Sequence, residues 1–255
     1  MVKNLIRRSK FVVENLFKSN DVNIFNVNDC LTMTGFSYGA EGWHHLITLL
    51  HQINQNPKLK MKESILYEFH QKFIPQNNND IFSFKSDLTK IQFPLGIFPW
   101  GSYIIKPSKH SKIVTQNWDK SNYCGPSSDS FLEERFKIIR NLYFSIKKKG
   151  YQPYLGYHPQ TYHGLIGGTI LEKENGEKKF IVHQGNHRLA VLSFLGYKEI
   201  KTSFINGYHR VIKQKQLDQW KYVLNGKISV DVANEIFNIL YNSNGLDIAS
   251  RYNLK

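Results

Sequence analysis

The sequence predicts an α+β protein in which a small mixed β-sheet is flanked by helices toward both ends of the chain. Three patterns predict this class. Asn175 and Gly176 stand between two apolar runs at residues 167–171 and 179–183, a pattern typical of a β-hairpin. The second run leads through a polar turn into a helix that ends near Gly196. Amphipathic periodicity recurs toward both termini, which indicates helices that cover the sheet.

Residues 1–93 are expected to form a helical extension. Apolar residues recur at helical spacing in three segments, and prolines follow the second and third of them. The stretch 21–41 has no such pattern and is expected to be irregular. The predicted helices of this extension are residues 1–20, 43–53 and 62–73.

Residues 94–212 are expected to form the core. Its first strand or two should lie around residues 103–105. Ser130 and Glu133 match a capping box, which predicts a helix that continues to Lys148. Besides the hairpin and its following helix, strands are expected at residues 154–157 and 199–205.

Residues 213–255 are expected to form a C-terminal helical extension. A helix is predicted over residues 214–224, ending before Gly226. Ser229 is a suitable N-cap for a second helix, whose apolar stripe includes Ile236 and Leu240. The chain shows no internal repeat, and no linker in it is long enough to separate independent domains.

Composition limits the classes of function. The chain carries 34 Lys and Arg against 20 Asp and Glu, a formal charge of +14. This balance fits phosphorylated ligands, nucleic acid or an anionic surface, but the lysines are spread along the whole length instead of clustered. Cys30 and Cys124 match no disulfide or zinc pattern, so we expect a cytoplasmic protein without a structural metal. No apolar run is long enough to predict a membrane span.

The turn at residues 185–188 is the leading candidate site. It places Gly185, Asn186, His187 and Arg188 at the start of a helix, where backbone N–H groups and the helix dipole favour an anion. Glycine lets a ligand approach the backbone, and arginine and histidine add side-chain donors. The turn is therefore a candidate phosphate cradle. The alternative is a turn whose polar residues only cap the helix.

Two blocks in order give the chain a resemblance to a known superfamily. One is the strand and Gly-x-His-Arg turn at residues 180–188. The other runs over residues 142–155, with Ser145 and Ile146 in a helix and Gln152 and Pro153 before a strand. Together they resemble the ParB/sulfiredoxin superfamily over about residues 94–205. Flanking segments resemble an uncharacterised family that carries this domain with extra N- and C-terminal helices.

The resemblance implies a nucleotide as ligand. In the superfamily the corresponding turn binds the phosphates of ATP, ADP or CTP, and catalytic members use Mg²⁺. Sulfiredoxin has a cysteine after the glycine, whereas this chain has Asn186, which cannot act as a thiolate nucleophile. Relatives that act as kinases often have an acidic residue before the glycine, whereas this chain has Gln184.

The candidate residues follow from this comparison. Gly185, Asn186, His187, Arg188, Gln152 and Arg210 are expected to bind the nucleotide. His187 and Glu134 are the candidate catalytic residues, because hydroxyl activation needs a base within hydrogen-bond reach of the acceptor. Glu133 is the alternative carboxylate, although capping already explains it.

Three functions stay open on the sequence alone. The first is a nucleotide-dependent phosphotransferase or hydrolase that acts on a small molecule. The second is a DNA-binding protein, either switched by CTP like ParB or acting as a nuclease, which requires a recognition helix after the core. The third is a catalytically inert nucleotide-binding sensor or scaffold, which Gln184 favours. The sequence leaves the oligomeric state undefined.

Overall fold

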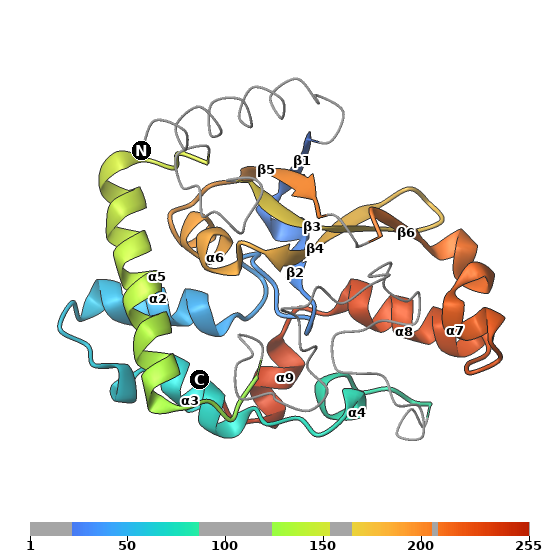
Figure 1. Cartoon of the computed structure of the whole chain (residues 1–255), viewed down its shortest axis with the longest axis horizontal. Coiled ribbons are helices and arrows are strands. Elements are labelled where there is room, and N and C mark those ends of the chain that lie inside the picture. The colour runs from blue at the N-terminus through green and yellow to red at the C-terminus, as the bar shows by residue number, and fades with distance from the viewer. Residues whose placement is uncertain (1–21, 87–123, 154–164, 206–208, 255) are drawn as a thin grey trace, which may run out of the picture.

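The protein is a mixed α+β fold built around a six-stranded sheet with helices on both faces (Figure 1). The computed structural model describes residues 22–86, 124–153, 165–205 and 209–254. The strand order is β1-β5-β3-β4-β2, and β6 also pairs with β3. The strands are β1 (Val22–Asn26), β2 (Cys30–Thr32), β3 (Ile166–Glu172), β4 (Lys178–Gln184), β5 (Glu199–Phe204) and β6 (Val211–Lys213).

The predicted hairpin is confirmed and forms the centre of the sheet. β3 and β4 pair in antiparallel fashion, and Gly176 in their turn has φ +87°. β5 and β6 both run parallel to β3, β5 beside its first residues and β6 beside residues 170–172. The carboxyl ends of β4 and β5 therefore meet the start of β3 at one end of the sheet.

The expectation that residues 21–41 are irregular is wrong, because they supply β1 and β2. β1 pairs with β5 in antiparallel fashion, and β2 pairs with β4 in parallel. Both lie at edges of the sheet and are short, so neither produces an alternation long enough to be recognised. The N-terminal part of the chain thus contributes strands to the sheet as well as helices that cover it.

Four helices cover one face of the sheet, on the side of α5 in Figure 1. They are α2 (His45–Gln55), α3 (Ile65–Lys72), α5 (Asp129–Lys149) and α6 (Asn186–Phe194). Phe180 and Val182 of β4 point into this core. The predicted long helix is confirmed, but its N-cap is Ser128 instead of Ser130: the Ser128 hydroxyl accepts from Phe131 N–H at 3.3 Å. Lys147–149 end the helix, where the dipole favours cations.

A second core covers the opposite face. Ile181, Leu171 and Ile212 point into it from the sheet, which explains the uninterrupted apolar run of β4: both of its faces are covered. The predicted helix over residues 214–224 is interrupted, because Trp220 is extended between two short pieces. The elements here are a 3-10 helix (Gln214–Gln219), α7 (Lys221–Leu224), α8 (Val230–Asn242) and α9 (Leu246–Arg251).

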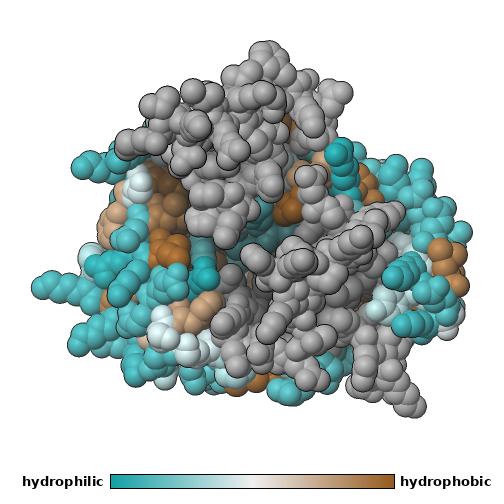
Figure 2. Space-filling model, in the orientation of Figure 1, coloured by the Kyte–Doolittle hydropathy of each residue, from teal (hydrophilic) through white to brown (hydrophobic). Residues whose placement is uncertain are grey.

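The remaining elements are short. They are α4 (Asn78–Ile81) and two 3-10 helices, Val27–Asp29 and Met61–Glu63. The predictions for residues 1–20, 103–105 and 154–157 lie outside the described residues. Within the described part of the chain, no helix has the length and apolar character needed to cross a membrane. On the face shown in Figure 2, hydrophilic residues dominate both lateral edges of the described surface.

Candidate functional site

The predicted turn joins β4 to α6 as expected. Gly185 adopts the left-handed conformation, with φ +94° and ψ +19°. The first intrahelical bond runs from Leu189 N–H to the Gly185 carbonyl at 2.9 Å, so the amides of residues 186–188 come before it. Gly185 has no side chain to cap them, and the first turn holds no acidic residue. The start of α6 thus has a helix dipole that favours an anion, with no acidic side chain to oppose it.

Asn186 is held by a tyrosine from a distant part of the chain. The Tyr38 hydroxyl donates to Asn186 Oδ1 at 2.5 Å, and Ser193 Oγ donates to the Tyr38 carbonyl at 2.5 Å. Tyr38 is fully buried. These bonds fix the loop before α2 against both ends of α6, and they orient the amide of the first residue of that helix.

His187 lies close to a second basic group, Arg135 of α5. Burial and, secondarily, the positive charge of Arg135 lower the pKa of His187 to about 4. Arg135 also lies over the ring of Phe131, at 4.8 Å from its centroid. Its Nε is buried, and no hydrogen-bond acceptor among the described residues contacts it. A buried donor without an acceptor is costly, and an anion at this point would remove the cost.

Three more histidines surround this region on the side of α2 and α3. His44, His45 and His70 are all buried, at 2, 3 and 2 % exposure. Burial lowers the pKa of His44 to about 3 and of His70 to about 4, and holds that of His45 well below its ordinary value. The proximity of His187 further lowers the pKa values of His44 and His45. All of these rings are therefore neutral near pH 7.

Arg188 folds back over the turn. Its Nη2 donates to the Leu165 carbonyl at 3.2 Å, at the start of β3. The same nitrogen lies 3.1 Å from the point where a Cβ on Gly185 would be placed, and Ile166 Cδ1 lies 2.9 Å from that point. Only glycine therefore leaves room for the arginine in this position.

Arg210 lies at the same end of the sheet. It precedes β6 directly, and its guanidinium lies over the ring of Phe204, the last residue of β5, at 5.4 Å. Phe204 pairs with Gly168 of β3. The residue before Gly168, Gly167, pairs with Gln184, which directly precedes the turn. The structure therefore brings Arg210 to the end of the sheet where the turn is located.

The structure does not bring Gln152 to the turn. α5 and α6 run in the same direction, because Arg135 is near His187 and Tyr143 is near Phe194, with ring centroids 5.5 Å apart. Gln152 is exposed and follows Lys149, the last residue of α5. At 1.5 Å per residue, Lys149 lies roughly 21 Å along the helix from Arg135. Gln152 therefore lies toward the C-terminal end of α6.

Glu134 is exposed on α5, one residue before Arg135. No described ion pair or hydrogen bond connects it to the turn. Its neighbour Glu133 is exposed as well and lines a separate groove with Lys60 and Lys137.

Two residues of the site were missed by sequence reasoning. Arg135 has no local signal, because only the packing of α5 against α6 brings it to His187. Tyr38 lies in the segment that was expected to be irregular. The one available hint was a tyrosine within a glycine-rich loop, because a tyrosine that folding buries needs a partner for its hydroxyl.

Substitution of Gly185 by alanine is expected to destabilise the fold by about 1–2 kcal/mol through its positive φ, and to displace Arg188. Gly196→Ala is the matched control, since Gly196 at the other end of α6 has φ +81° and nothing within 4 Å of its Cβ position. Urea unfolding should give a loss of this size for Gly196→Ala and a loss at least as large for Gly185→Ala, whose Cβ also meets Ile166 and Arg188. Anion binding at the turn should weaken only in Gly185→Ala, and equal binding by both variants would contradict the role given to Arg188.

No group of three His, Cys, Asp or Glu side chains in the described ranges could hold a metal ion. Comparison with protein families, curated proteins and solved structures finds no match to this chain.

Proposed function

We propose that this protein binds the phosphate groups of a nucleotide at the N-terminal end of α6. One observation carries the proposal: the buried Nε of Arg135 has no described acceptor and lies beside His187. His187 is in the first turn of α6, and this turn contains no acidic residue. Two basic side chains and a helix N-terminus converge there. An oxyanion is the ligand that accepts hydrogen bonds from all of them.

A nucleoside di- or triphosphate is the proposed source of that anion. Support comes from the resemblance to the ParB/sulfiredoxin superfamily, which rests on the turn and on the block that contains Gln152. The observed strand–glycine–helix geometry is compatible with that core, and we propose that Arg210, at the same end of the sheet, contacts a second phosphate. Both the core assignment and the nucleotide are parts of the proposal.

The geometry favours binding over turnover. A base with a pKa of about 4, as in His187, is poorly matched to removing a hydroxyl proton near pH 7. Glu134 is exposed and is not tied to the turn. Any Mg²⁺ would have to be held mainly through the ligand's own phosphate oxygens. We therefore propose a nucleotide-binding protein, with phosphotransferase or hydrolase activity as the extension that an acceptor screen would test.

The DNA-binding alternative has less support. A recognition helix must present free side chains to the bases. α9, the last described helix, has six residues, and Ile248 and Ala249 are buried. Its arginine, Arg251, is bonded to Asp247 and to the carbonyls of Asp80 and Ile81. These contacts tie α9 to the protein.

Thermal unfolding tests the proposal, with ATP, ADP, CTP and GTP each added with and without Mg²⁺. A nucleotide at about 100 times its dissociation constant should add roughly 2.7 kcal/mol of stability. Arg188→Ala and Arg135→Gln are expected to abolish most of the shift. Arg140→Gln is the matched control, because Arg140 is on the same helix but donates to the Pro57 carbonyl.

Two results would contradict the proposal. One is that no nucleotide raises the melting temperature of the wild-type protein. The other is a shift that Arg135→Gln and Arg140→Gln reduce equally, since this would show a general effect of positive charge instead of a site at the turn.

A further inference from the structure

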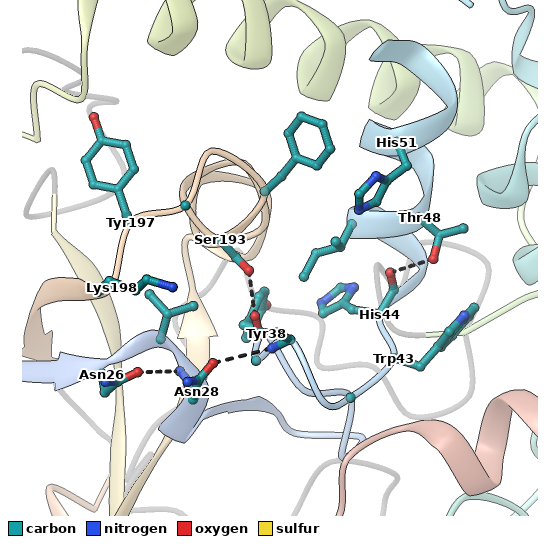
Figure 3. Close-up of a pocket in the computed structure, with 17 residues that line it drawn as sticks. Asn26, Asn28, Tyr38, Trp43, His44, Thr48, His51, Ser193, Tyr197 and Lys198 are labelled. Atoms are coloured by element: carbon teal, nitrogen blue, oxygen red, sulfur yellow. Dashed lines mark hydrogen bonds between the residues drawn. The ribbon is translucent and has the colours of Figure 1, made fainter. Parts of the chain in front are cut away.

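A cavity of about 340 Å³ lies at the C-terminal end of α6, whereas the turn is at the start of this helix (Figure 3). It is bounded by the start of α2, by the segment after β1, and by the C-terminal end of α6. Its volume is at the lower end of the range for small-molecule sites. Neither the sequence patterns nor the proposed nucleotide site accounts for it.

His44 supplies a directed donor to this cavity. It is the N-cap of α2, and its Nδ1 accepts from Leu46 N–H at 3.1 Å. A neutral ring that accepts at Nδ1 carries its proton on Nε2. That Nε2 is buried and has no hydrogen-bond partner among the described residues. Figure 3 shows the ring extending from α2 toward Ser193 and Tyr38, whereas Trp43 points away.

The lining of the cavity includes one lysine and no acidic side chain. Lys198 and His51 line it together with His44, and none of its 17 lining residues is acidic. Lys198 forms no ion pair with a described carboxylate. The start of α2 adds the positive end of an eleven-residue helix. The cavity therefore favours a negative charge.

The rest of the lining is apolar or weakly polar. Val27, Ile47 and Phe194 supply hydrophobic contacts, and the ring of His51 lies edge-on to Phe194 at 4.8 Å. A bare ion would leave these surfaces in contact with water. The lining is complementary to a molecule with an anionic group at one end and an apolar body at the other.

We propose that this cavity is a second ligand site, which binds a small organic molecule bearing a carboxylate or a phosphate group. The oxyanion accepts from His44 Nε2 and pairs with Lys198, and the apolar body contacts Ile47 and Phe194. The site does not depend on the proposed nucleotide site, because it uses none of Arg135, His187 or Arg188.

Isothermal titration calorimetry with five probes tests this site. Acetate and inorganic phosphate present the two anions alone, and benzoate and phenyl phosphate add an apolar ring. Benzyl alcohol provides the ring without the charge. We expect benzoate or phenyl phosphate to bind more tightly than its bare anion and than benzyl alcohol. The preferred member of the pair identifies the oxyanion.

Variants locate the binding. Lys198→Met keeps the aliphatic stem and should weaken binding by about tenfold or more, as expected for loss of a charged hydrogen bond. His44→Asn retains an N-cap acceptor but removes the Nε2 donor, and it should weaken binding as well. Lys201→Met, which changes an exposed lysine of β5 outside the cavity, should have no effect.

Arg188→Ala separates this site from the nucleotide site. Binding that survives Arg188→Ala and is weakened by Lys198→Met supports the second site, whatever the outcome with nucleotides. The proposal is overturned if none of the ring-bearing anions binds at millimolar concentration or if benzyl alcohol binds as well as they do. It is also overturned if Lys198→Met has no effect while Arg188→Ala abolishes binding.

Discussion

Acidification from about pH 7.5 to about pH 5 is expected to lower the free energy of unfolding by several kcal/mol. The reason is the group of histidines that the fold buries in the neutral form. His44, His70, His183 and His187 have pKa values lowered to between about 3 and about 4, chiefly by burial, and that of His45 is lowered as well.

The sign follows from proton uptake. Between about pH 4 and pH 6.5 the unfolded chain protonates these histidines and the folded protein does not, so the unfolded state binds more protons and stability falls as the pH falls. The stabilisation is complete above about pH 6.5. For His44 and for His70, the loss down to about pH 5 is roughly 2 kcal/mol each.

Urea unfolding across this pH range measures the effect. His70→Gln should reduce the pH dependence by about one proton near pH 5. His51→Gln is the comparison variant, because it removes a histidine whose side chain is exposed instead of buried. A free energy of unfolding that stays constant from about pH 7.5 to about pH 5 would show that these rings are not buried as described.

Alanine at Gly168 is expected to destabilise the protein by about 3 kcal/mol or more, as overpacking of a core can do. Gly168 is in the middle of the sheet, where a Cβ would lie 2.0 Å from the Ile181 carbonyl oxygen and 2.7 Å from the ring of Phe180. The carbonyl belongs to the neighbouring strand and cannot move without breaking the β3–β4 pairing. The register already shifts between Gly167 and Gly168.

Gly176→Ala in the turn of the same hairpin is the comparison for Gly168→Ala. Gly176 has a positive φ, unlike Gly168, but nothing lies within 4 Å of the added Cβ. It should lose only about 1–2 kcal/mol, from the backbone conformation. If chemical denaturation gave Gly168→Ala the same stability as the wild type, the close approach of β3 to β4 would be refuted.

The elements that the sequence predicts well are those whose signals are local. The hairpin at Gly176, the helix after Gly185 and the stripe of α8 follow from turn residues, caps and periodicity. β1 and β2 could not be predicted, because each is a short edge strand defined by its pairing with distant β5 and β4. The pieces around Trp220 were missed for a related reason: the buried Trp220 side chain interrupts an otherwise helical pattern.

The same distinction applies to the candidate site. Residues 185–188 were identified because they are contiguous and flanked by a strand and a helix. Arg135 is fifty-two positions before His187 in the sequence and meets it only through helix packing, whereas its neighbour Glu134, chosen for its chemistry, is exposed. His44 becomes a donor to the cavity only when α2 is placed against α6, although its capping bond to Leu46 N–H is local.

The central claim is that a phosphate group binds beside His187 at the start of α6. Nuclear magnetic resonance titration of the histidine rings, with and without the nucleotide that stabilises the protein most, tests it directly. A bound phosphate favours the imidazolium, so the pKa of His187 should rise from about 4. The pKa of His70, which lies on α3 and is hydrogen-bonded to Ser127, should stay unchanged. A pKa of His187 that is the same in the free and nucleotide-saturated protein would contradict the claim.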